Sequence, residues 1–119
     1  MKGVRSTKPR IEVAEQVFKT LIQYTENRPD MTMSCMWEFF PLKKICSVPK
    51  DATAFSRSPY GNVLQIVRWT ENTEDNLKYA RDVSREIMDI VVKGNVELSD
   101  AENIGYGNYG ELIFWGIPA

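Results

Sequence analysis

The chain has 119 residues, with 15 basic and 16 acidic side chains and a formal net charge of −1. This length suits a single domain, and an apolar content of 43% with 26% charged residues is that of an ordinary globular protein. The balanced charge argues against a nucleic-acid partner, which requires a concentrated positive field. No apolar run approaches the length of a membrane span.

The sequence contains no histidine. This absence removes the usual general base near neutral pH and excludes Ser-His and Cys-His nucleophile pairs. The only cysteines, Cys35 and Cys46, are too few for a zinc site, and we expect neither a metal nor a cofactor. Because no secretion signal precedes them, we expect two reduced, buried and inert thiols in a cytoplasmic protein.

The basic residues near the start predict a flexible tail over residues 1–9, followed by a single domain over residues 10–119. Apolar side chains then recur at spacings of three and four, which predicts a one-faced amphipathic helix that ends near Asn27. These apolar residues are Ile11, Ala14, Val17, Phe18, Leu21 and Ile22.

Two segments have the composition of β-strands. The first, residues 34–40, is short and aromatic, and the second, residues 63–70, is β-branched and apolar. Pleat alternation places Gln65 on one face of the second strand and Arg68 on the other. Between them, residues 53–55 suggest a short edge strand and residues 58–62 a turn.

A second helix follows, capped by Asn72 or Thr73 and ending at Lys93-Gly94. Its apolar stripe is Leu77, Ala80, Val83 or Ser84, Ile87, Met88 and Val91. Residues 104–110 form a glycine-and-tyrosine loop, and residues 112–115 form a last strand or an exposed apolar end.

This order predicts an α+β fold in which two helices cover one face of a small antiparallel sheet, of ferredoxin-like character. The second face of the sheet is also partly apolar. We therefore expect that face to meet a ligand, another domain or, in a homodimer, a second copy of the chain.

The candidate catalytic residues are Glu38, Gln65 and Arg68, which are polar groups within apolar strands. If the strands are neighbours in a suitable register, Glu38 and Arg68 meet on one face. They then form an ion pair, or Glu38 takes a raised pKa among aromatic neighbours and transfers a proton. Gln65 is placed to orient a carbonyl group.

Aromatic residues are concentrated between residues 37 and 69 and indicate core or dimer packing, or a pocket for an apolar small molecule. The loop over residues 105–110 lacks the preceding strand and following helix of a phosphate site, but its side chains can stack and hydrogen-bond. The candidate substrate-binding residues are Trp37, Phe40, Phe55, Tyr60, Trp69, Tyr106, Asn108 and Tyr109.

Several dispersed segments resemble the C-terminal part of fungal flavin-linked oxidases of the berberine-bridge-enzyme-like, vanillyl-alcohol-oxidase type. These segments are residues 37–44, 48–49, 52–55, 62–64, 68–69, 76, 80–81, 97–99 and 102–109. In that family the segment belongs to the substrate-binding domain, where an antiparallel sheet covers the flavin ring. The resemblance implies that the loop with Tyr106, Asn108 and Tyr109 faces the flavin site. The family's flavin-binding domain has no counterpart in these 119 residues.

The resemblance therefore implies a substrate domain without its cofactor. We expect a cofactor-independent enzyme of fungal secondary metabolism, a cyclase, cycloaddition catalyst or isomerase that orients an apolar intermediate. The alternatives are a non-catalytic binding or interaction module, and a truncated fragment of a flavin-linked oxidase.

Overall fold

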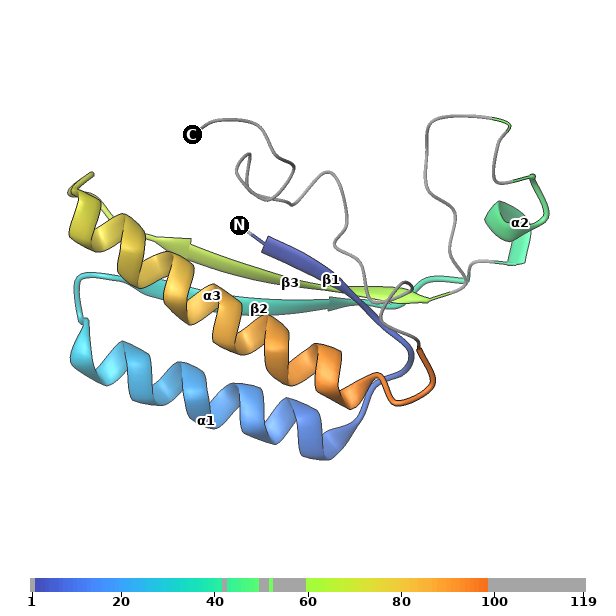
Figure 1. Ribbon diagram of the computed structural model, residues 1–119, viewed down its shortest axis with the longest axis horizontal. Coiled ribbons are helices and arrows are strands. Elements are labelled where there is room, and N and C mark those ends of the chain that lie inside the picture. Colours follow the sequence, from blue (N-terminus) through green and yellow to red (C-terminus); the bar gives the residue numbers. More distant parts are fainter. Residues whose placement is uncertain (1, 42, 50–51, 53–59, 99–119) are drawn as a thin grey trace.

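A computed structural model describes residues 2–41, 43–49, 52 and 60–98 (Figure 1). The chain is α+β, as predicted. Its elements, in order, are β1 (Lys2–Ser6), α1 (Ile11–Asn27), β2 (Thr32–Glu38), α2 (Lys43–Cys46), β3 (Gly61–Arg68) and α3 (Glu74–Gly94).

The three strands form one antiparallel sheet in the order β1-β3-β2. In the register of β2 and β3, Cys35 lies opposite Gln65 and Trp37 lies opposite Val63. Both predicted strands exist, but each begins and ends two residues earlier than expected. Phe39, Phe40 and Trp69 therefore lie beyond the strand ends.

The core lies between one face of this sheet and the long helices α1 and α3. Val4 and Val63 supply its sheet side, and Val17 supplies the most deeply buried side chain of α1. The contribution of α3 is Val83, Ile87, Met88 and Val91. Both long helices lie on one face of the sheet, as the sequence predicted.

The stripe predicted for α3 is buried as expected, except that Leu77 remains exposed. Thr73 is the N-cap, because its side-chain oxygen accepts a hydrogen bond of 3.2 Å from the backbone N–H of Asn76. Glu74 and Asp75 occupy the first turn, where negative charge suits the helix dipole.

The prediction of a single apolar face on α1 is wrong. Only Val17 is fully buried, whereas Ile11 is 77%, Phe18 64% and Ile22 41% exposed. At 100° per residue these three side chains form their own stripe, centred about 120° around the helix from Val17. The apolar arc of α1 is thus wider than the core it covers.

The prediction of a flexible tail is wrong for residues 2–6, which form the edge strand β1. Val4 is buried and pairs with Val63, so a single apolar residue places this basic segment in the sheet. The residue that follows α3, Asn95, fixes the C-terminal end of β1 by hydrogen bonds. The Asn95 amide donates to the Arg5 carbonyl (2.7 Å) and accepts from the Thr7 backbone N–H (3.2 Å).

At the other end of the helices, Tyr24 of α1 packs edge-on against Tyr79 of α3, with ring centroids 5.7 Å apart. The Tyr79 hydroxyl donates to the Tyr24 carbonyl (3.1 Å), and the Tyr24 hydroxyl donates to the Glu86 carboxylate. This hydrogen bond to Glu86 and partial burial raise the pKa of Tyr24 to about 12. The Arg28 guanidinium lies 4.8 Å from the centroid of the Tyr79 ring.

The predicted strand at 53–55, the loop at 104–110 and the segment at 112–115 lie outside the described residues, as does most of the turn at 58–62. No helix in the described part of the chain is long and apolar enough to cross a membrane. Within the same residues, no group of acidic, cysteine or histidine side chains is arranged to hold a metal ion.

Candidate functional site

The three predicted catalytic residues do not converge. Glu38 and Arg68 share the sheet face away from the helices, but Glu38 lies opposite Asn62 whereas Arg68 lies opposite Thr32. Six residues of extended chain separate these positions, about 20 Å at the rise of a β-strand. Gln65 is on the opposite face, toward the helices. The prediction that Glu38 and Arg68 meet is therefore wrong, because the register of β2 and β3 holds them apart.

The four aromatic candidates within the described residues do not gather into one pocket either. Trp37 pairs with Val63 at one end of β3, and Trp69 follows the other end of that strand. Phe40 is 63% exposed beyond β2, and Tyr60 is partly buried just before β3. Four other candidates lie outside the described residues: Phe55, Tyr106, Asn108 and Tyr109.

The structure instead forms an apolar groove between α1 and β2, with a volume of about 440 Å³. We call it the α1/β2 groove. From α1 it is lined by Ala14, Val17, Phe18 and Leu21. From β2 it is lined by Met33, Ser34, Cys35 and Trp37. Of the predicted substrate-binding residues that the structure describes, only Trp37 lines it.

A smaller hollow of about 220 Å³ continues the groove toward the start of α1. It shares Ala14 and Trp37 with the larger one and adds Pro9, Arg10 and Ile11. Of the described residues along this path only Arg10 is charged, and it pairs with Glu97. The described lining is therefore mainly apolar, with a paired cation at one end.

The groove also borders a strand edge. Within the described residues β2 pairs only with β3, so alternate N–H and C=O groups of β2 point outward, beside the groove. Proline and charged residues usually protect an edge strand from further pairing. Strand β2 has no proline, and its only charged residue is Glu38 at its end.

The width of the helix layer explains the groove. Side-by-side helices lie about 8–10 Å apart and strands about 4.8 Å apart, so two helices span about four strands. The described sheet has three strands, and α3 covers both β1 and β3. Helix α1 contacts β2 and runs along its outer side (Figure 1). The outer side of α1 therefore extends beyond β2 by about the width of one strand, and the groove lies under this part of the helix.

Electrostatics keep the groove neutral. Among the described residues of its lining, Cys35 is the only ionisable group, and burial raises the pKa of this thiol to about 12. The thiol is therefore protonated at neutral pH and is a poor nucleophile. Both cysteines are unpaired, as predicted, but Cys35 is only partly buried and Cys46 is exposed.

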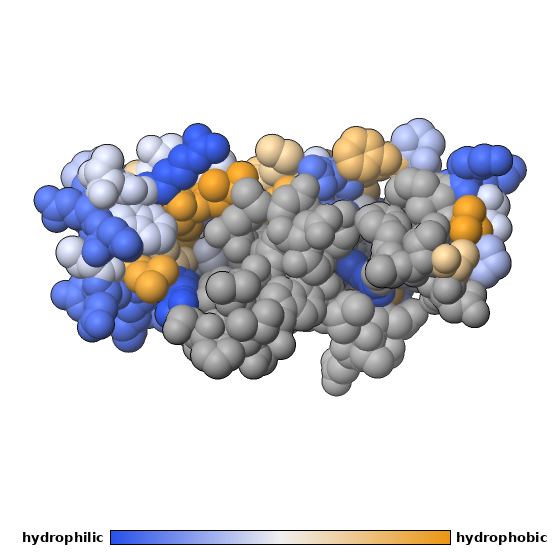
Figure 2. Space-filling model, turned by 90° about the horizontal axis from the view of Figure 1, so that it is seen from above, coloured by the Kyte–Doolittle hydropathy of each residue, from blue (hydrophilic) through white to orange (hydrophobic). Residues whose placement is uncertain are grey.

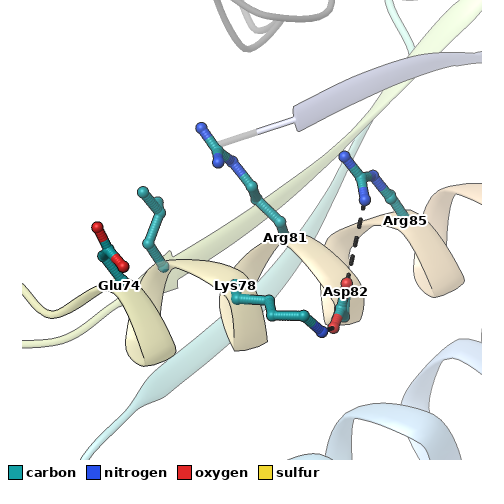
Figure 3. A pocket seen from close by; sticks show the side chains of 6 residues that line it. Glu74, Lys78, Arg81, Asp82 and Arg85 are labelled. Carbon is teal, nitrogen blue, oxygen red and sulfur yellow. Dashed lines mark hydrogen bonds and ion pairs between the residues drawn. The ribbon is translucent and has the colours of Figure 1, made fainter. Parts of the chain in front are cut away.

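A second hollow, of about 390 Å³, follows the outer face of α3 (Figure 3). Asp82 there pairs with Lys78 at 2.8 Å and with Arg85 at 4.0 Å. Such i,i+3 and i,i+4 pairs are typical of a solvated helix face. Apolar side chains also reach the surface in separate places on the side seen in Figure 2. The α1/β2 groove differs from them in lying beside a strand edge that has no partner in the described part of the chain.

Comparison with protein-family models, curated proteins and solved structures finds no match to this chain. The resemblance to flavin-linked oxidases therefore stays a prediction. Sequence reasoning missed the groove because it assigned Ile11, Phe18 and Ile22 to the core. The spacing of these residues, at i, i+7 and i+11, was the available signal for a second apolar stripe.

Proposed function

We propose that this domain is an interaction module that binds an extended segment of another protein by strand addition to β2, with uncharged side chains on the inward side of that segment. The observation that carries this proposal is the edge of β2 beside the α1/β2 groove, which has no strand partner among residues 2–41, 43–49, 52 and 60–98. An added strand satisfies the outward N–H and C=O groups of β2, and its alternate side chains enter the groove.

The chemistry of the groove favours such an occupant. A segment in this position has to supply its own backbone donors and acceptors in extended form, which a compact apolar molecule does not. Its inward side chains have to be uncharged, because none of the described residues that line the α1/β2 groove carries a charge to balance them.

A synthetic peptide tests the proposal. The acetylated, amidated sequence Lys-Val-Lys-Val-Lys-Val-Lys matches the seven residues of β2 and directs its valines to one side. We expect saturable binding by titration calorimetry, with a Kd on the order of 10–100 μM for so small an interface. A peptide with prolines in place of the two inner lysines lacks two backbone donors and should not bind.

Matched variants locate the site. Phe18→Lys alters an exposed groove residue and should weaken binding at least ~10-fold without unfolding the chain. Val96→Lys alters a side chain that is 76% exposed outside the groove and should leave binding unchanged. Equal effects of the two variants would contradict the assignment.

Other occupants of the groove give other results. A second copy of the chain would appear as a dimer by light scattering that Phe18→Lys dissociates. Occupation by residues 111–119 of the same chain would appear as NMR contacts between those residues and Cys35 or Phe18. Either result would overturn binding of a separate segment.

A cofactor-independent enzyme acting on an apolar small molecule is the second candidate. The buried amide of Gln65, which lies one strand inward from the groove, supports it, because an amide can orient a substrate carbonyl. Glu38 and Arg68 have no catalytic role in this second candidate function, because the strand register keeps them apart. Saturable binding of apolar carbonyl compounds that Gln65→Met abolishes, together with no binding of the peptide, would favour this candidate.

The finer details of the fold are also proposals. The order β1-β3-β2, with a helix after β1 and another after β3, fits the first five main elements of a ferredoxin-like βαββαβ pattern. A homodimer through the sheet face away from the helices is supported by Met36, which is 47% exposed there beside Leu64. Met36→Lys should dissociate such a dimer in sedimentation equilibrium.

A further inference from the structure

The wall that α1 contributes to the α1/β2 groove is uneven. Phe18 and Leu21 present large side chains there, whereas Ala14 presents only a methyl group. At 100° per residue these three positions lie within about 60° of one another around the helix, so they belong to the same wall. The wall is therefore lowest at Ala14, and we call this place the Ala14 notch.

Trp37 of β2 lies at the level of the Ala14 notch. Helix α1 and strand β2 run in opposite directions, so the start of the helix is beside the end of the strand (Figure 1). Ala14 and Trp37 line both the α1/β2 groove and the smaller hollow of about 220 Å³ that continues it. Ala14 is exposed and Trp37 is partly exposed, so an occupant of the groove contacts both directly.

Packing within the fold does not explain the small size of Ala14. Gly94 of α3 is small because a Cβ atom there would lie 2.6 Å from Val13 of α1. Ala14 is instead exposed, and a leucine at this position would extend the apolar wall at little cost in helix propensity. What Ala14 provides is open space in front of Trp37.

A strand added to β2 brings its inward side chains to this space. These side chains lie opposite Met33, Cys35 and Trp37, with Cβ atoms about 4.5–5.5 Å apart across the pair. The side chain opposite Trp37 therefore lies against the indole ring and points into the Ala14 notch.

The middle inward position offers less room. Four residues of helix and two residues of strand each span about 6–7 Å, so Phe18 lies near the level of Cys35. Both residues line the groove. A side chain opposite Cys35 therefore meets the Phe18 ring where the end position meets a methyl group.

We propose that Ala14 and Trp37 are the specificity-determining residues of the α1/β2 groove, and that they select one aromatic side chain at the inward position of the bound strand opposite Trp37. This inference rests on the proposed strand-addition function. It adds to that function a requirement for a large residue at one end of the bound segment and smaller ones elsewhere on its inward side.

The lining of the Ala14 notch favours an aromatic ring over an aliphatic side chain. Aromatic pairs gain from stacked or edge-to-face contact beyond the area that they bury, and Trp37 supplies one ring of such a pair. The guanidinium group of Arg10, paired with Glu97, borders the same hollow and packs favourably on an aromatic face. The hollow is smaller than the about 300–1,000 Å³ of small-molecule sites, which suits a single side chain.

Three peptides test the inference. Each is the valine–lysine peptide described above with phenylalanine in place of one valine, at the second, fourth or sixth residue. We expect the full-length chain to bind at least one of the two end-substituted peptides roughly 5- to 10-fold more tightly than the valine peptide. The peptide with phenylalanine at the fourth residue should gain less than this. In NMR spectra, the ring protons of the tighter peptide should contact the Ala14 methyl group.

The Ala14→Leu variant closes the notch. Because the position is exposed and leucine is a good helix former, the variant should fold. It should bind the end-substituted phenylalanine peptide no more tightly than the valine peptide. Gln23→Leu adds the same side chain to an exposed position about 180° around α1 from Ala14, and it should leave the preference for phenylalanine unchanged.

The outcomes separate this inference from the function on which it rests. Equal affinities of the end-substituted and middle-substituted peptides overturn the role of Ala14 and Trp37 and leave strand addition intact. A preference for phenylalanine that persists in Ala14→Leu overturns that role as well. Failure of the valine peptide and of all three phenylalanine peptides to bind overturns strand addition, and the specificity inference with it.

Discussion

Gln65 of β3 and Cys35 of β2 face each other across the sheet, and both side chains are directed toward the helix layer. Cys35 separates the buried amide from the α1/β2 groove. The pair thus places the apolar α1/β2 groove next to a buried amide that has no hydrogen-bonding partner among the described residues. The stability and the reactivity of the domain should both reflect this arrangement.

Replacing Gln65 by methionine should stabilise the domain. The substitution removes two unsatisfied polar atoms and keeps the volume, so the free energy of unfolding should rise by about 1–3 kcal/mol. Urea denaturation followed by circular dichroism measures the change. Asn76→Leu is the control, because its amide is paired with Glu71 and Arg28, and it should destabilise by a similar amount. A loss of stability in Gln65→Met would contradict the account.

The two thiols should differ sharply in reactivity. At pH 8, iodoacetamide should alkylate the exposed Cys46 and leave Cys35 unmodified, because burial raises the Cys35 pKa to about 12. Mass spectrometry of tryptic fragments distinguishes the two sites. Faster modification of Cys35 than of Cys46 would show that the groove is hydrated and open at its centre.

The raised pKa of Cys35 also has a defined effect on stability. Folding favours the neutral thiol, so its contribution is fully present below the ordinary pKa of 9.0 and is lost as the pH rises toward about 12. The difference in unfolding free energy between the natural chain and Cys35→Ala should therefore decrease between pH 8 and pH 10.5. A difference that does not change over this range would contradict the burial of the thiol.

Gly94 allows α3 to approach α1 closely. A Cβ atom at this position would lie 2.6 Å from Cγ2 of Val13, so Gly94→Ala should destabilise the domain by about 1–3 kcal/mol. Adding Val13→Ala should relieve the clash. The double variant should then be more stable than the sum of the two single effects predicts, as measured in a double-mutant cycle. Strict additivity would mean that the helices are not in contact here.

The Tyr24–Glu86 hydrogen bond should make the pairing of α1 and α3 sensitive to alkaline pH. The Tyr24 pKa is raised from 10.0 to about 12, so the protonated hydroxyl stabilises the fold below pH 10, and this contribution is lost as the pH rises toward 12. In an NMR titration, Tyr24 should ionise after a free tyrosine does. Glu86→Gln should bring its pKa down, and an unchanged pKa in that variant would exclude Glu86 as the cause.

The sequence was sufficient to predict elements whose apolar pattern agrees with their final burial. The stripe of α3 and the β-branched run of β3 are of this kind, and both elements form close to where they were expected. Strand β1 was missed because its place in the sheet depends on pairing with β3, more than fifty residues away, and only Val4 carries an apolar signal.

The candidate site was less predictable for a related reason. Residue type indicated that Glu38, Gln65 and Arg68 are unusual for their strands, but register decides which of them meet, and it separates all three. Phe18 was assigned to the core on helical spacing alone. Its exposure follows from the number of strands under α1, which local sequence does not specify.

Amide hydrogen exchange along β2 is the most direct test of strand addition. The full-length chain is compared by NMR with and without a saturating amount of the valine–lysine peptide. We expect the amides of β2 whose N–H groups point away from β3 to exchange at least ~10-fold more slowly when the peptide is bound, while the outer face of α3 is unaffected. Bound peptide with unchanged exchange along β2, or with protection confined to another element, would contradict the account.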